Sequence, residues 1–284
     1  MMNLSNPTEL KLLLNRHGFS FSKSLGQNFL IDADILSKIV SAAEINENDY
    51  VLEIGPGAGT LTQYLADNCK KVVAVEIDKA LLPILNDSMN GYDNFKLINA
   101  DIMKTDIKSL AESEFDKKPF HVVANLPYYI TTPIVMKLFE ERLPVKSMTL
   151  MVQKEVAERM CAKSGGKDYG ALSVAVQYHS YAKCVCTAQP HCFIPNPKVA
   201  SCVVNLQIPD EKPFTVNDEK KFFAIVKSAF GQRRKTLVNA LLKSPYIHLE
   251  KNDILSALKS LDLDENIRGE KLSISEFARL SDIL

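Results

Sequence analysis

The chain has 284 residues, which is enough for one large domain and a second, smaller one. Hydrophobic residues make up 46% and charged residues 24%, as in ordinary globular proteins, and no apolar run approaches the roughly 18 residues of a membrane-crossing helix. With 34 basic and 34 acidic side chains the formal net charge is zero, so overall charge does not indicate a nucleic-acid partner. The N-terminus has no basic-then-apolar signal pattern, and we expect a cytoplasmic protein without membrane association.

The first expected elements are helices over residues 8–16 and 33–43. Apolar runs then predict strands over 50–55, 71–78, 95–101, 120–125 and 147–153. Helical patterns lie between them, near 60–68, 79–90 and 131–141. This alternation predicts a mostly parallel sheet covered by helices on both faces. Two later strand-like runs, 172–180 and 201–208, are expected to pair as an antiparallel edge.

After Pro209 the pattern becomes helical, without convincing strands. We therefore expect an α/β domain over residues 1–209 and a small helical domain over 210–284. Residues 218–244 carry seven basic and two acidic side chains, among them Arg233, Arg234 and Lys235. A local basic face suits phosphate binding whatever the total charge, although a solvated helix face is the simpler explanation of such a run.

The six cysteines form no CxxC pair. Four of them lie between residues 184 and 202, near His179 and His191, but their spacing fits no common zinc pattern. We expect reduced, buried thiols and no bound metal, with a zinc site as the less favoured alternative.

A glycine-rich turn, Gly55-Pro56-Gly57-Ala58-Gly59, follows the first expected strand and opens a helix. Glycines let the backbone pass close to a ligand, and the helix N-terminus offers amide donors. The dinucleotide fingerprint would have its third glycine at position 60, which is Thr60 here. The turn therefore suits a ligand without a pyrophosphate, such as S-adenosylmethionine, better than a dinucleotide. On its own it is equally compatible with a plain strand-to-helix connection.

Three polar side chains end the strands that follow. Glu76 ends the second strand, where a carboxylate can accept from ribose hydroxyls. Asp101 ends the third strand, in a position to accept from an adenine amine, and Asn125 ends the fourth. Each alone is compatible with a solvated strand end. Because open α/β sheets bind ligands at the carboxyl ends of their strands, we expect these residues to form one nucleoside-binding site with the glycine turn.

The turn Asn125-Leu126-Pro127-Tyr128 combines an amide, backbone carbonyls and an aromatic ring. We expect the Asn125 side-chain oxygen and the Pro127 carbonyl to accept the N–H bonds of an exocyclic amine, and Tyr128 to stack on the base. Accepting those bonds would push the amine nitrogen toward tetrahedral geometry and favour direct methyl transfer. An ordinary strand-to-helix turn is the alternative.

Several segments together resemble the small-subunit (16S) ribosomal RNA adenine N6-dimethyltransferases, the KsgA family. The resemblance spans residues 24–237 in the family's order. The matching segments are Ser24–Leu30, Val51–Gly57, Val75–Asp78, Asn125–Tyr128, Phe193–Val199 and Phe230–Leu237.

The resemblance implies a Rossmann-like class I methyltransferase sheet with a C-terminal helical RNA-binding domain. It implies that Asn28 and Leu30 close over S-adenosylmethionine and that Phe193 stacks on the target adenine opposite Tyr128. The residues that it assigns to the cofactor are Asn28, Leu30, Gly55, Gly57, Glu76, Asp101, Ile102 and Asn125. The residues that it assigns to the target and the RNA are Asn125, Pro127, Tyr128, Phe193, Arg233, Arg234 and Lys235.

The implied activity is N6,N6-dimethylation of two adjacent adenines in a stem-loop near the 3′ end of small-subunit rRNA. The implied partner is that rRNA or the immature small ribosomal subunit, and we expect a monomer. Two alternatives remain at this stage. One is a related methylase of large-subunit rRNA, with a DNA adenine methylase less favoured. The other is a non-catalytic assembly or transcription factor that keeps the fold.

Overall fold

A computed structural model describes residues 2–22 and 25–284, so Ser24 of the first matching segment lies outside the described residues. The chain divides into two compact units. The first combines the residues up to Ala157 with Lys183–Ile208, and the second combines Glu158–Ala182 with Pro209–Leu284. The chain therefore passes between the two units three times, and the expected boundary near 209 is the last of these three points. The other two lie at the ends of residues 158–182, which belong to the second unit.

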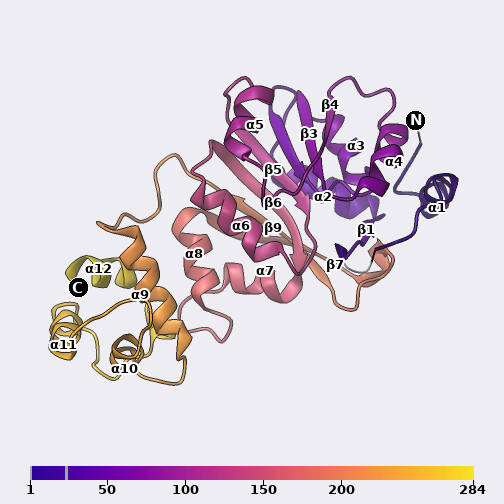
Figure 1. The fold of residues 1–284 in the computed structure, drawn as a ribbon. Coiled ribbons are helices and arrows are strands. Elements are labelled where there is room, and N and C mark those ends of the chain that lie inside the picture. Colours follow the sequence, from indigo (N-terminus) through magenta and orange to yellow (C-terminus); the bar gives the residue numbers. More distant parts are fainter. Residues whose placement is uncertain (1, 23–24) are drawn as a thin grey trace. The chain divides into compact units, whose positions relative to one another are not determined.

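The first unit is built on a sheet with the strand order β4-β3-β2-β5-β6-β9-β7 (Figure 1). Its strands are β2 (Tyr50–Ile54), β3 (Lys71–Glu76), β4 (Phe95–Asn99), β5 (Phe120–Asn125), β6 (Val145–Gln153), β7 (Tyr181–Ala188) and β9 (Ser201–Gln207). The pairs from β4 to β6 are parallel, and β6 pairs with β9 in antiparallel register. The prediction of a mostly parallel sheet with an antiparallel edge is confirmed.

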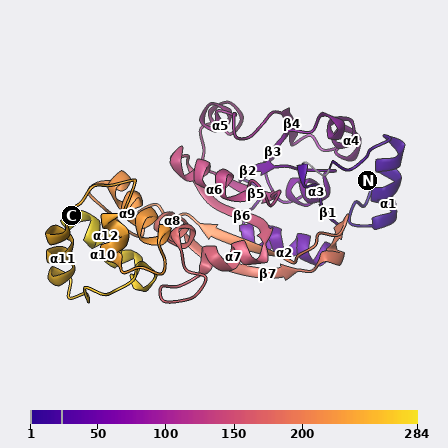
Figure 2. The same cartoon turned by 60° about the horizontal axis from the view of Figure 1, so that its bottom comes forward.

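Helices cover both faces of this sheet, with α5 and α6 on one side and α2 on the other (Figure 2). They are α1 (Pro7–Arg16), α2 (Ala33–Ala43), α3 (Thr60–Ala66), α4 (Leu82–Ser88) after a short 3-10 turn (Lys79–Leu81), α5 (Ile107–Glu114) and α6 (Thr131–Glu140). Val51, Val123 and Val203 share one apolar cluster with α2 and α3. Because the central strands are buried on both faces, such β-branched residues follow one another along them and form continuous apolar runs in the sequence.

The prediction of a strand over 172–180 is wrong, because this segment forms the helix α8 (Ala171–His179). Its start is fixed by the Ser173 hydroxyl, which accepts from the backbone N–H of Gly170 at 3.0 Å. Leu172–Val176 and Tyr178 are all buried, so the apolar run shows no one-sided period that separates a helix from a strand. The edge of the sheet is supplied instead by β7, which follows directly.

The second unit is helical. It contains α8, α9 (Glu219–Gly231), α10 (Leu237–Leu242), α11 (Lys251–Ser260), a 3-10 turn (Gly269–Lys271) and α12 (Ile274–Ile283), while α7 (Lys154–Cys161) crosses the unit boundary. Its core joins Phe222, Leu241 and Phe277 to Tyr169 and Tyr178 from the inserted segment. Within the described residues of both units, no helix has the length and apolar character to cross a membrane.

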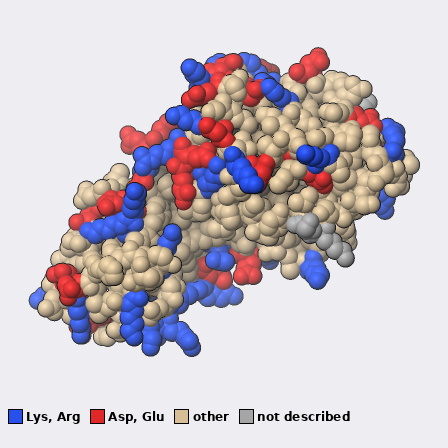
Figure 3. Space-filling model, in the orientation of Figure 1, with Lys and Arg blue, Asp and Glu red and all other residues tan. Residues whose placement is uncertain are grey.

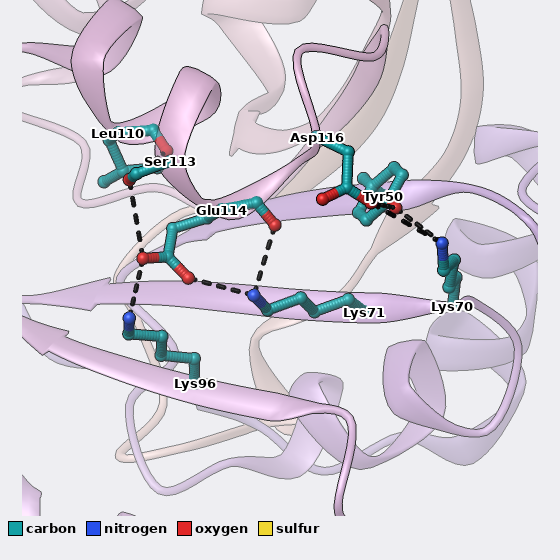
Figure 4. Close-up of polar contacts among 8 residues, drawn as sticks. All are labelled: Tyr50, Lys70, Lys71, Lys96, Leu110, Ser113, Glu114 and Asp116. Atoms are coloured by element: carbon teal, nitrogen blue, oxygen red, sulfur yellow. Dashed lines mark hydrogen bonds and ion pairs between the residues drawn. The ribbon is translucent and has the colours of Figure 1, made fainter.

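Ion pairs tie α5 to the amino ends of β3 and β4 (Figure 4). The Glu114 carboxylate accepts from Lys71 Nζ at 2.9 Å and from Lys96 Nζ at 2.6 Å, and the hydrogen bond from Lys96, then that from Lys71, lowers its pKa. Asp116 accepts from the Tyr50 hydroxyl, which in turn accepts from Lys70. This network lies at the amino ends of the strands, so it stabilises the sheet edge opposite the site described next.

Candidate active site

A cavity opens at the carboxyl ends of β2, β3, β4 and β5, in the first unit. It is lined by residues 25–30, by the end of β2 with the glycine turn, by Val75–Ile77, by Ala100–Ile102 and by residues 125–130. We call it the cofactor cavity. Among the residues assigned to the cofactor from sequence, Asn28, Leu30, Gly55, Gly57, Glu76, Asp101, Ile102 and Asn125 all line it. The structure therefore brings together residues that lie up to 97 positions apart.

The glycine turn has the backbone that only glycine adopts easily. Gly55 and Gly57 have φ values of +69° and +62°. A Cβ on Gly57 would lie 2.9 Å from the Phe29 ring, whereas a Cβ on Gly55 would have no atom within 4 Å. Gly57 is therefore required by packing as well as by conformation, and Gly55 leaves open space beside the backbone at the wall of the cavity.

Two carboxylates extend the cavity beyond the turn. Glu76 is 5% exposed and accepts from the backbone N–H groups of Asp78 at 2.8 Å and Gly57 at 3.4 Å. Burial raises its pKa, against the effect of these hydrogen bonds. Asp101 accepts from the backbone N–H of Met103 at 2.9 Å. Each carboxylate keeps further acceptor capacity for hydroxyl or amine donors of a nucleoside.

The Asn125 amide is oriented by the segment before the sheet. Its Nδ2 donates to the Asn28 carbonyl at 2.9 Å, so the Oδ1 atom is the side-chain acceptor left for a ligand. The Pro127 carbonyl was expected to be the second acceptor, but it already accepts from Ile130 N and Thr131 Oγ1, both at 3.2 Å. No described residue donates to the Leu126 carbonyl, which leaves that oxygen available to an outside donor.

Tyr128 and Phe193 lie in different surroundings. Tyr128 lines the cavity, and its hydroxyl is 2.7 Å from Ser201 Oγ, which fixes the ring. Phe193 is 1% exposed, lies in an apolar cluster with Val203, and is not among the described lining residues. It belongs to β8 (Phe193–Ile194), where it pairs with Leu30 of β1 (Phe29–Leu30). In this conformation Phe193 lies next to Leu30, and its ring is too buried to stack on a base.

Among the lining residues that sequence reasoning did not assign, three have a clear role in the cavity or an unusual position. Gln27 donates to Asp78 Oδ2 at 2.6 Å and holds residues 25–30 against the end of β3. Ile77 is 51% exposed and lines the cavity wall. Glu53 is 1% exposed on β2. Its only sequence signal is an acidic residue inside an otherwise apolar strand, Tyr50–Ile54.

The sequence pattern suggested that the basic residues assigned to RNA lie on a helix, but in the structure they do not. Arg233, Arg234 and Lys235 occupy the connection between α9 and α10 in the second unit. Several Lys and Arg side chains project from the lower left part of the surface in Figure 3. Arg233 donates to the Lys167 carbonyl at 2.8 Å and pairs with Glu270 at 3.3 Å. Arg234 and Lys235 are exposed, and no described residue pairs with their side chains.

The cysteine-rich segment forms no recognisable metal site. Among the described residues, no group of three or more His, Cys, Asp or Glu side chains is arranged to hold a metal ion. Cys192 instead donates to Asp32 Oδ2 at 3.3 Å, beside the N-terminus of α2.

Three comparisons relate the chain to known proteins. A family model described as "Ribosomal RNA adenine dimethylase" matches residues 18–284. A relative from Lachnoclostridium phytofermentans named "Ribosomal RNA small subunit methyltransferase A" is 50% identical over 285 residues, which are 100% of this chain and 98% of that protein. A relative of the same name from Clostridioides difficile is also 50% identical, over 284 residues that cover 100% of this chain and 98% of that protein.

Two solved structures share the fold. A dimethyladenosine transferase from Plasmodium falciparum superposes with a TM-score of 0.74 at 30% identity, covering 89% of this chain and 95% of that one. The 23S rRNA methyltransferase ErmE gives a TM-score of 0.70 at 26% identity, covering 90% and 99%. The sheet, the cavity at its carboxyl edge and the helical second unit are therefore those of a class I methyltransferase with a C-terminal helical region.

Proposed function

Because the chain belongs to the ribosomal RNA adenine dimethylase family, we propose that it dimethylates N6 of two adjacent adenines in a stem-loop near the 3′ end of small-subunit rRNA. It is an S-adenosylmethionine-dependent rRNA adenine dimethyltransferase. The observation that carries the choice of an adenine amine is the Asn125 side chain. Its Nδ2 is held by the Asn28 carbonyl, which leaves Oδ1 as an acceptor at the cavity wall.

The residues of the cofactor cavity fit S-adenosylmethionine. We assign the open space beside Gly55 to the amino-acid part, Glu76 to the ribose hydroxyls, and Asp101 with Ile102 to the adenine. Ile77, which is exposed at the cavity wall, would contact a face of the same ring. When bound, the cofactor supplies a methyl group on a positively charged sulfur, which is already a reactive donor.

The chain's own contribution is to hold the target amine. The Asn125 Oδ1 and the Leu126 carbonyl accept its two N–H bonds, which localises the lone pair on nitrogen and directs it at the methyl group. Alignment of this kind can supply effective molarities of ~10⁵–10⁸ M, so no side chain with a tuned pKa is required for the transfer. After transfer the amine proton leaves to solvent.

The target base must leave its stack to reach the turn. Tyr128, fixed by Ser201, supplies a ring at the cavity, and Tyr129 beside it is 60% exposed. Stacking on an aromatic side chain contributes roughly 1–3 kcal/mol per base, which offsets part of the unstacking cost. We assign stacking to Tyr128. Phe193 takes part only if it leaves the core position that it occupies here.

The second unit is proposed to bind the RNA backbone through the connection between α9 and α10. All three of its cations are exposed, but Arg233 is held by the Lys167 carbonyl and Glu270, which leaves Arg234 and Lys235 without a described partner. The partner that we propose is the immature small ribosomal subunit, with the protein acting as a cytoplasmic monomer.

The substrate is tested by methylating purified small and large ribosomal subunits from a strain that lacks this enzyme. We expect labelled methyl groups on adenine in the small subunit only, mapped by mass spectrometry to two neighbouring nucleotides with two methyl groups each. Methylation confined to the large subunit would overturn the proposed substrate and favour the related class of enzyme represented by the 23S rRNA methyltransferase.

A further inference from the structure

The charge of the cofactor cavity is one-sided. Glu53, Glu76 and Asp101 line it, and none of its described lining residues is a lysine or arginine. A cavity lined by three carboxyl groups and by no described lysine or arginine side chain is suited to a cationic ligand. How many of these groups are ionised before the ligand arrives decides how binding depends on pH.

Glu53 differs from the other two acids in having an oxygen without a partner. Its Oε2 is buried and accepts no hydrogen bond from the described residues, while both oxygens of Glu76 accept from backbone N–H groups. The Thr60 hydroxyl, on the same cavity wall, is also buried without a partner. A buried carboxyl oxygen left unpaired is costly when charged, and it indicates a group that is completed by a ligand or stays neutral.

Among the neighbours of Glu53, only the Thr62 hydroxyl favours its charged form, by a hydrogen bond that lowers its pKa. Glu76, on the adjacent strand β3, is acidic, and the helix α3 brings Thr60 and Thr62 but no charged residue. The nearby Cys69 thiol is buried, and burial raises its pKa to about 12. Lys71 and His121 lie on the two neighbouring strands, but at their opposite, amino ends. Burial, together with the nearby Glu76 carboxylate, raises the pKa of Glu53 to about 8, against the opposing effect of the Thr62 hydroxyl.

We propose that Glu53 carries a proton in the empty cavity and releases it to solvent when S-adenosylmethionine binds, so that its carboxylate faces the cofactor's positive charge. The step is an acid dissociation: the O–H bond of the Glu53 carboxyl breaks and the proton goes to solvent. Glu53 thereby acts as a positioning residue for a cation. This inference rests on the proposed cofactor binding and adds a linked proton to it.

The sign of the pH dependence follows from this linkage. A neutral Glu53 must lose its proton before it faces the cation, so affinity rises with pH while the empty form is protonated. The dissociation constant of S-adenosylmethionine falls as pH rises toward about 8, by up to about tenfold per unit, and levels off above it. A site whose acids were already ionised would show no such slope near neutral pH.

The test is calorimetric titration of the full chain with S-adenosylmethionine at pH 7, in two buffers of different ionisation enthalpy. We expect release of most of one proton per bound ligand, because pH 7 lies below the raised pKa of Glu53. The neutral nucleoside 5′-methylthioadenosine is the control ligand and should release none. In Glu53→Gln we expect no proton release and a dissociation constant that no longer varies between pH 6 and 8, whereas Glu53→Asp, which keeps a carboxyl group, should still release a proton.

Two results would overturn the inference. One is wild-type binding of S-adenosylmethionine without proton release and with equal affinity at pH 6 and 8, which leaves the cofactor assignment standing. The other is undiminished release in Glu53→Gln, which assigns the proton to another group. Absence of any binding would instead contradict the proposed function. Should Glu53→Gln fail to fold, the wild-type titrations with the two ligands still decide whether a proton is released.

Discussion

Gly55 and Gly57 both hold a left-handed backbone, but their surroundings differ. Gly57 faces the Phe29 ring, while the space beside Gly55 is open. If the amino-acid part of the cofactor occupies that space, a methyl group on Gly55 must interfere with binding. Backbone strain is a separate effect: a non-glycine residue in the left-handed region costs roughly 1–2 kcal/mol of folding stability, whereas a clash with the ligand lowers affinity.

We therefore predict that Gly55→Ala folds but binds S-adenosylmethionine at least about tenfold more weakly, a difference of about 1.4 kcal/mol. The control is Gly91→Ala, which also has a positive φ (+100°) and open space around it, outside the cavity. It should lose a similar amount of stability in urea and keep wild-type affinity. Equal affinity in both variants would contradict the assignment of the space beside Gly55 to the amino-acid part of the cofactor.

The sequence alone predicted those site residues whose type and position at a strand end indicate ligand binding. The glycine turn, Glu76, Asp101 and Asn125 stand at strand ends, where topology dictates that they meet. The acceptor role that we propose for the Leu126 carbonyl could not be predicted in this way, because it depends on the hydrogen bonds that Ile130 and Thr131 donate to the Pro127 carbonyl. The burial of Glu53 likewise arises only when the strands are packed.

Among the elements, the parallel strands were predictable because buried strands are continuous apolar runs bounded by turns. The helix α8 was not, since it is apolar on nearly every side. The two-residue strands β1 and β8 carry no periodicity at all, yet their pairing places Leu30 in the cavity and Phe193 in the core. The position of Phe193 therefore comes from long-range pairing.

The connection between α9 and α10 gives a prediction at the same scale. Replacing Arg234 and Lys235 together by Gln should weaken binding to small-subunit rRNA and lower the slope of log affinity against log salt by about 1–2. The control removes the same charge from α11, with Lys251→Gln and Lys259→Gln, and should change the slope less. An unchanged slope in the first double variant would contradict the assignment of this connection to RNA.

At the scale of the whole molecule, the helical unit is not a C-terminal segment alone. Residues 158–182 contribute Tyr169, Val174 and Tyr178 to its core, each at most 1% exposed. Sequence placed this segment in the first domain because it precedes the last strands of the sheet. An insertion that leaves one unit and packs in another is visible only in three dimensions.

This interruption predicts how fragments behave. Residues 209–284 alone should show no cooperative thermal unfolding by circular dichroism, because the removed segment leaves its core open. Joining residues 158–182 to this fragment through a Gly-Ser linker should restore a cooperative transition. A cooperative transition in the shorter fragment would mean that the inserted segment is dispensable for folding.

The central claim is that the Asn125 side chain holds the target amine, and Asn125→Ala tests it most directly. Methyl transfer to immature small subunits and the dissociation constant of S-adenosylmethionine are measured on the same preparation. The account predicts that transfer falls by about 10²–10³-fold, the usual effect of removing one polar contact made in the transition state, while the dissociation constant changes less than about tenfold. Transfer at the wild-type rate would contradict it.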